Sequence, residues 1–172
     1  MAAKMGAVLV LSFSPLRSDP RVDRQIRALV RSYPVVSCGY GSAPQGVTEH
    51  VQVDPGARTL YGLALAAAQL KLGMTEQFYW SHARIRATLK ALAGRAFDLV
   101  IANDFEALPV SIKLAAGAPV LFDAHEYAPL EFEDLPVWRF FFASYRDRMC
   151  KKYLPRAAVV TTVCQGIAER YR

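Results

Sequence analysis

The side chains best suited to chemistry follow a short apolar segment in the second half of the chain. Residues 120–122 have the length of a strand, and Asp123, His125 and Glu126 come directly after them. An apolar run bounded by Pro and polar residues is typical of a strand buried on both faces of a parallel sheet. Ligands of open α/β sheets bind just beyond the carboxyl ends of the strands, where titratable groups can be solvated and paired. The segment therefore predicts a site, and the simpler alternative is that Asp123 caps a turn and His125 forms a local hydrogen bond.

Two other predicted strands end in polar residues in the same way. Residues 7–13 are followed by a polar loop that begins at Ser14, and residues 97–102 are followed by Asn103 and Asp104. Right-handed crossovers bring the carboxyl ends of all parallel strands to one edge of the sheet. We therefore expect a single ligand site at this edge. Its candidate binding residues are Ser14, Arg17, Asp19, Arg21, Asn103, Asp104, Asp123 and Glu126, together with His125.

Arg17 and Arg21 lie beside the start of a predicted helix. Asp19 has the residue type of an N-cap, and Pro20 suits the first helical position. Free N–H groups and the helix dipole favour an anion at such a place, and the two arginines would add to this preference. The alternative is an ordinary solvated first turn.

The apolar pattern places these segments in an alternating β/α chain. Alternating strands and helices predict an α/β fold, a doubly wound parallel sheet of the Rossmann-like kind, in one domain. The predicted strands are 7–13, 35–38, 47–53 (half-buried, near an edge), 97–102, 120–122 and 157–163. The predicted helices start at 20, span 59–72, carry residues 78–92, follow residue 106, span 134–154 and start at 165.

Composition restricts the possible partners and cofactors. The formal net charge of +6 favours anionic partners, and the absence of a basic low-complexity tail argues against nucleic acid. The loop after the first strand lacks the G-x-G-x-x-G pattern, and no G-x-x-x-x-G-K-[ST] pattern occurs, so no nicotinamide, flavin or P-loop site is expected. Three scattered histidines give no metal-ligand spacing, so we expect neither a metal nor another cofactor.

Three widely spaced cysteines and the lack of an apolar run near ~20 residues indicate a cytoplasmic protein without a membrane-spanning helix. The apolar N-terminal run lacks a small-residue cleavage site and leads into a helix start, so we interpret it as the first strand and not as a signal peptide.

Four stretches together resemble one enzyme family. They are Ser18-Asp19-Pro20-Arg21-Val22 with Arg24-Gln25, Ile101-Ala102-Asn103-Asp104, Phe122-Asp123-Ala124-His125-Glu126, and residues 160–169, where Cys164 replaces the usual Ser. In this order they resemble GT-B glycosyltransferases of the retaining, glycogen-synthase-like group (glycosyltransferase family 4-like). The resemblance spans nearly the whole chain.

The resemblance implies a two-domain enzyme that transfers a hexosyl group from a nucleotide-sugar to a lipid-linked, saccharide or small-molecule acceptor. Residues 1–172 would form the N-terminal, acceptor-side domain, and the C-terminal domain that binds the donor would be absent from this chain. The domain alone would then be inactive. Two alternatives remain open on the same fold: half of a UDP-sugar epimerase, or a non-catalytic binding or regulatory half that acts with a partner chain.

The resemblance also implies that His125 is the catalytic residue and contacts the transferred sugar. A neutral imidazole that accepts a hydrogen bond from a sugar hydroxyl would position the sugar ring without repelling the positive charge that develops on it. Along an extended segment Asp123 and His125 share one side and Glu126 faces the other, so Asp123 is expected to orient the ring.

The predicted long helix, 134–154, combines aromatic and basic residues. An interfacial helix of this composition would be drawn to anionic lipid, which would suit a lipid-linked acceptor and a peripheral membrane protein. The alternative is a helix packed on the core with a solvated basic face. The candidate membrane or acceptor surface consists of Trp138, Arg139, Arg146, Arg148, Lys151 and Lys152.

Overall fold

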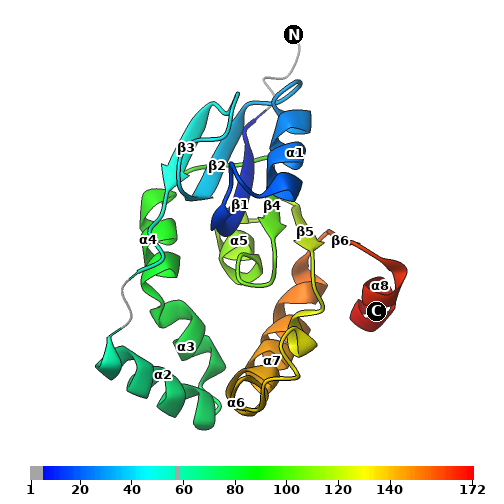
Figure 1. The fold of residues 1–172 in the computed structure, drawn as a ribbon. Coiled ribbons are helices and arrows are strands. Elements are labelled where there is room, and N and C mark those ends of the chain that lie inside the picture. The colour runs from blue at the N-terminus through cyan, green and yellow to red at the C-terminus, as the bar shows by residue number, and fades with distance from the viewer. Residues whose placement is uncertain (1–5, 57–58) are drawn as a thin grey trace.

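The computed structural model describes residues 6–56 and 59–172, which form an α/β domain around one parallel sheet (Figure 1). The six strands lie in the order β3-β2-β1-β4-β5-β6, and every neighbouring pair is parallel. The predicted doubly wound, Rossmann-like fold is confirmed. The strands are β1 (Val8–Pro15), β2 (Val35–Tyr40), β3 (Glu49–Gln52), β4 (Leu99–Asn103), β5 (Val120–Ala124) and β6 (Val159–Thr162).

Helices cover the sheet unequally. On one face, Val22 and Ile26 of α1 (Pro20–Leu29) pack on Val8, Val10 and Ile101. On the other face lies the larger core, to which α3, α4, α5 and α7 contribute and in which Phe122 is fully buried. The remaining helices are α2 (Leu60–Lys71), α3 (Thr75–Ser81), α4 (Ala83–Ala91), α5 (Leu108–Ala115), α6 (Pro136–Trp138), α7 (Ser144–Tyr153) and α8 (Gln165–Tyr171).

Local sequence signals explain several element boundaries. Asp19 caps α1 by accepting hydrogen bonds from the backbone N–H groups of Arg21 and Val22, and Pro20 occupies the first turn, as predicted. Pro109 also lies in the first turn of its helix, α5, where its missing N–H costs nothing. The half-buried strand predicted for 47–53 is β3, which forms one edge of the sheet.

Two predicted helices differ in the structure. The helix expected over residues 78–92 is interrupted at His82, whose backbone is extended, so α3 and α4 are separate. The helix expected over 134–154 begins at Pro136 and contains a π-helical turn, η2 (Arg139–Ala143), between α6 and α7. The helical periodicity of apolar residues cannot predict such interruptions, because tertiary contacts determine where they occur.

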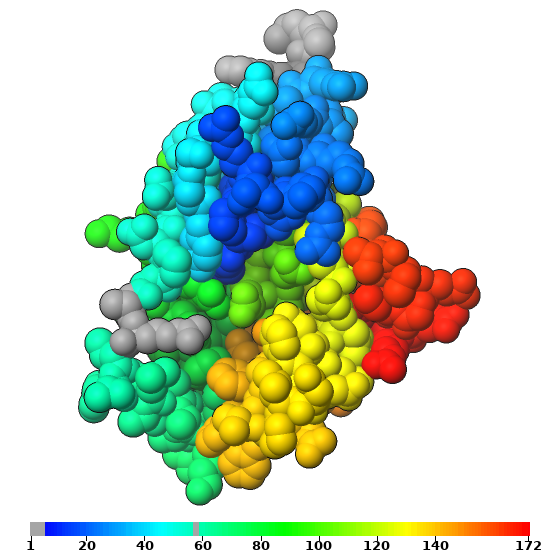
Figure 2. All heavy atoms as spheres, in the orientation of Figure 1, coloured from blue at the N-terminus to red at the C-terminus, as the bar shows by residue number. Residues whose placement is uncertain are grey.

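The helix α2 is unusual because it has no buried residue. Leu60 is 87% exposed and Tyr61 is 80% exposed, and Phe140 of η2 is 70% exposed. The segments α2 and η2 contact each other, and Figure 2 shows both segments at the end of the molecule opposite α1. We call this surface the α2/η2 apolar surface; its members are Leu60, Tyr61, Leu63, Leu65, Leu135, Val137 and Phe140.

The difference in burial between two phenylalanines gives a test of the fold. Phe122→Ala removes a fully buried ring from the middle of β5, so the free energy of unfolding should fall by about 3–5 kcal/mol. Phe140→Ala removes an exposed ring and should change it by less than about 0.5 kcal/mol. Urea unfolding of both variants measures the difference, and equal losses would contradict this placement of β5.

Candidate functional site

The register of the strands builds one polar layer at the carboxyl edge of the sheet. Ser12 of β1 pairs with Asn103 of β4, Asn103 pairs with Asp123 of β5, and Asp123 pairs with Thr161 of β6. Registered residues of parallel strands point to the same face. Here that face is the one packed by α1, since Val10, Ile101 and Leu121 form the layer beneath.

A glutamine of α1 closes this layer from above. The Gln25 side-chain oxygen accepts from the Asn103 amide at 3.0 Å, and its nitrogen lies 3.5 Å from the Asp123 carboxylate. Asp123 also accepts from the Thr161 hydroxyl at 2.7 Å and from His125 Nε2 at 3.3 Å. The His125 hydrogen bond, followed by that of Thr161, lowers the pKa of the Asp123 carboxyl. Asp123 is therefore ionised, and its hydrogen bonds fix the position of its carboxylate.

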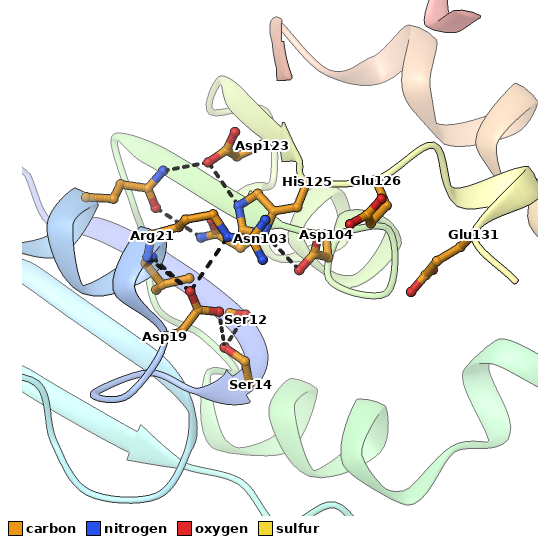
Figure 3. Close-up of polar contacts among 12 residues, drawn as sticks. Ser12, Ser14, Asp19, Arg21, Asn103, Asp104, Asp123, His125, Glu126 and Glu131 are labelled. Carbon is orange, nitrogen blue, oxygen red and sulfur yellow. Dashed lines mark hydrogen bonds and ion pairs between the residues drawn. The ribbon is translucent and has the colours of Figure 1, made fainter. Parts of the chain in front are cut away.

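His125 lies between two carboxylates (Figure 3). Its side chain is only 2% exposed, Nε2 faces Asp123, and Nδ1 lies 3.2 Å from Asp104 without the alignment of a directed hydrogen bond. The Asp104 carboxylate, followed by that of Asp123, raises the pKa of His125 to about 9, although burial and Arg21 oppose the rise. A pKa raised in this way favours the imidazolium over the neutral imidazole that would accept from a sugar hydroxyl, because both ring nitrogens face carboxylates.

Asp104 reaches His125 from an uncommon backbone conformation. Its φ of 64° is left-handed, which Asp tolerates better than most residues. The Asp104 N–H donates to the carbonyl of Asp123 at 3.0 Å, and the Asp104 carbonyl accepts from Ala107 just before α5. The carboxylate remains 43% exposed, so one side can pair with His125 while the other faces solvent.

The residues of the first loop fix the start of α1 and cap its N-terminus. Ser14 donates to Asp19 Oδ2 at 3.1 Å, and the hydroxyls of Ser12 and Ser14 are 3.0 Å apart. Because Asp19 accepts hydrogen bonds from the backbone N–H groups of Arg21 and Val22, these two groups are not free to bind an anion. The half-exposed side chain of Arg21 lies 4.0 Å from Asp19 (Figure 3).

Two candidates do not join this hydrogen-bonded cluster. Arg17 is exposed, and within the described part of the chain no hydrogen bond or ion pair links it to the other candidates. The Glu126 side chain is exposed, and its backbone carbonyl accepts from Tyr171 of α8. Figure 3 shows Glu126 on the far side of the chain from Asp123, as the alternation along the strand predicted.

The sequence analysis missed Ser12, Gln25, Arg24 and Thr161. Ser12 and Thr161 could be found only from the strand register, which apolar patterning alone does not define. Gln25 lies one turn past the helix start, a spacing that would have indicated the same face as Arg21. Arg24 lies on that face as well.

A second charged cluster corrects the expectation for the basic helix. Arg146 is buried, pairs with Glu131 and with Glu106 at 3.7 Å, and stacks over the rings of Phe105 and Trp138. It therefore cannot form part of a membrane surface. The half-buried Trp138 packs in the same cluster.

Most of the remaining basic side chains of α7 also have partners. Lys151 pairs with Asp147 at 2.8 Å, Lys152 pairs with Glu76 at 3.0 Å, and Arg148 binds the hydroxyl of Ser144 at 3.2 Å. Of the predicted surface, Arg139 and Arg148 are exposed without an ion pair among residues 6–56 and 59–172. The side chains of the predicted basic face therefore mostly contact other residues of α7 or residues of α3.

A pocket of about 380 Å³ opens beside His125, between α1 and the ends of β5 and β6. We call it the α1 pocket; its lining residues are Arg21, Arg24, Gln25, Ala28, Asp123, His125, Thr162 and Val163. Its volume suits part of a small organic substrate. In the portion of the chain that the structure describes, no group of three His, Cys, Asp or Glu residues is arranged to hold a metal ion.

The fold and the site define an α/β domain that presents a charged, partly buried cluster at the carboxyl edge of a parallel sheet. The model of the glycosyl transferase 4-like domain matches residues 18–172. The chain therefore belongs to the glycosyl transferase 4-like domain family, and it is a glycosyltransferase domain. A search of curated proteins found no match.

The titration of His125 tests the geometry of the cluster. Its folded-state pKa lies above the ordinary value of 6.5, so the stability from this group should be complete below about pH 6.5 and lost as pH rises through about 9. In an NMR titration of the histidine Cε1–H resonances, His125 should titrate near 9, and Asp104→Asn should lower this pKa toward the ordinary value. His82, whose pKa burial lowers, serves as the internal reference. An unshifted His125 would contradict the two-carboxylate arrangement.

Proposed function

We propose that this domain forms the acceptor side of a retaining glycosyltransferase that transfers a hexosyl group from a nucleotide-sugar donor. The observation that carries the proposal is the buried His125 ring between the carboxylates of Asp104 and Asp123 at the carboxyl edge of the sheet, in a chain of this family. A second Rossmann-like domain, in the GT-B arrangement, would bind the nucleotide. The acceptor would be a lipid-linked sugar, a saccharide or a small molecule.

The charges of the cluster suit this reaction. Two carboxylates and one imidazolium leave one net negative charge where departure of the nucleotide would put positive character on the sugar ring. Preorganised charges that match a developing charge lower the barrier because they need no reorganisation. In this proposal the exposed side of Asp104 accepts from a sugar hydroxyl, and His125 keeps that carboxylate oriented.

The two alternatives predict other features. A UDP-sugar epimerase would need groups that take a proton from the sugar ring, whereas both nitrogens of His125 already face carboxylates. A non-catalytic half would tolerate neutral replacements in the cluster without loss of a reaction. The family match favours neither alternative.

Transfer activity is expected to depend on Asp104. In the enzyme expressed with its donor domain, Asp104→Asn should lower the transfer rate by about 10²-fold, since it removes one positioned, charged contact. Radiolabelled nucleotide-sugars and a panel of lipid and saccharide acceptors provide the assay. The control is Asp98→Asn, which lies before the opposite end of β4, binds the backbone N–H of Gly6 and should leave the rate unchanged.

His125→Ala is a less specific test, because it leaves two carboxylates facing each other and should lower the melting temperature as well. Normal transfer by Asp104→Asn would refute the role proposed for the cluster. Sugar transfer by residues 1–172 alone would refute the need for a second domain.

The same enzyme would associate with membranes through the α2/η2 apolar surface. The observation that favours this is α2 itself, an apolar helix without a buried residue, next to the exposed Phe140. Lys71 and Arg139 lie on the same segments and would attract anionic lipid. Within the described residues, no helix combines the length and apolar character needed to cross a bilayer. In this proposal the contact is peripheral and lies on the cytoplasmic side.

Vesicle binding measures this contact. The protein should co-sediment with vesicles that contain anionic phospholipid and much less with neutral ones, and Leu60→Ser with Tyr61→Ser should reduce the bound fraction several-fold. Val159→Ser changes an exposed apolar residue on β6, outside the α2/η2 apolar surface, and serves as the control. Binding that survives the double substitution would place the contact elsewhere.

A further inference from the structure

The helix α1 presents two different faces. Val22 and Ile26 are buried against the sheet, whereas Arg21, Arg24, Gln25 and Ala28 line the α1 pocket. These four positions have the spacing i, i+3, i+4 and i+7, which places them in one row along a helix. The row faces the ends of β5 and β6, where Thr162 and Val163 form the opposite wall. The pocket thus carries two arginines, one turn apart.

The only carboxylate that lines this pocket, among the described residues, is already satisfied. Asp123 accepts from Thr161 and His125 and lies within 3.5 Å of Gln25. Its ion pair is with His125, at 3.3 Å. Among the described residues Asp123 forms no ion pair with Arg21 or Arg24, although the charge of Arg21 acts on it from a longer distance.

Arg24 is left without a counterion. It is exposed, and no carboxylate of residues 6–56 and 59–172 lies within 4.0 Å of its guanidinium. Arg27, one turn further along α1, differs because it pairs with Asp23 at 2.7 Å and does not line the pocket. Arg21 has only a distant contact, 4.0 Å, with the capping Asp19. The pocket therefore has an excess of positive charge.

We infer that the α1 pocket binds a phosphate or diphosphate group of a substrate, through Arg21 and Arg24. Two guanidinium groups carried by positions i and i+3, about 4.5 Å apart along the helix axis, can each bind a pair of oxygens, which a diphosphate supplies and a single carboxylate does not. The assignment of this group to a sugar-transfer substrate rests on the proposed function, whereas anion binding does not. The phosphate could belong to the acceptor or to the donor nucleotide, and the two sources give different results below.

Calorimetric titration of the 172-residue chain with sodium pyrophosphate at constant ionic strength tests the inference. Arg24→Ala should weaken binding about tenfold or more, the loss expected for a charge-assisted contact. Arg27→Ala removes the same charge from the same helix and should change the affinity less than twofold. Circular dichroism confirms that both variants retain the helix, and Arg24→Gln replaces Arg24→Ala if the latter unfolds.

A second readout locates the bound anion. The Cε1–H resonance of His125 should shift on addition of pyrophosphate, while that of His50, on the far edge strand β3, should not. Absence of binding, equal losses in the two arginine variants, or an unshifted His125 would each overturn the inference. No turnover is measured, so a protein that transfers no sugar can still pass this test, and an active transferase can fail it.

In the enzyme expressed with its donor domain, uridine diphosphate distinguishes the two sources. If Arg24→Ala weakens the binding of uridine diphosphate as it weakens that of pyrophosphate, the pocket holds the phosphates of the donor. If Arg24→Ala leaves the binding of uridine diphosphate unchanged and weakens only that of pyrophosphate, the phosphate belongs to the acceptor. Both results support a phosphate site and differ only in the substrate that occupies it.

Discussion

The in-register parallel pairing of β1, β4, β5 and β6 is the constraint on which the site depends. Hydrophobic packing sets this register, because Val10, Ile101 and Leu121 must share the face covered by α1. The next residues on that face are Ser12, Asn103 and Asp123, which end the apolar layer with a polar one. A shift of one residue in β5 would turn Asp123 toward the opposite core and Phe122 toward α1. Packing of the apolar core therefore fixes the positions of the polar site residues, although Val10, Ile101 and Leu121 do not line the pocket themselves.

Given this register, electrostatics determines the protonation state of the cluster. An isolated imidazolium in a side chain that is 2% exposed would lose its proton, since burial disfavours the charged form. Two carboxylates outweigh that cost, and the pKa of His125 rises in spite of burial. Asp104 can take part only because its backbone adopts a left-handed conformation at the end of β4. Backbone strain at a ligand-binding edge is a common means of aiming a functional side chain.

The strand-end rule predicted the centre of the site because it needs only strand positions and crossover handedness. It brought Asn103, Asp104, Asp123 and His125 together, and the structure places them together. It could not identify Gln25 or Thr161, whose roles depend on helix docking and on the register of β6. The charge on His125 also depended on a partner 21 positions earlier in the chain, which no local pattern indicates. The basic helix was interpreted wrongly at Arg146 because composition does not show that Glu131 and Glu106 fold against it.

His125 lies between surroundings of opposite charge. On one side are Asp104 and its exposed oxygens, and on the other are the arginines of α1 across the pocket. Asp123 separates the two, and its three donors keep it from pairing with Arg24. A transferred sugar gains positive character while phosphate groups carry negative charge, so the two sides suit different parts of the same reaction. Among the described residues no ion pair joins the arginines of the α1 pocket to Asp104 or Asp123, so the two charged regions stay separate in the structure.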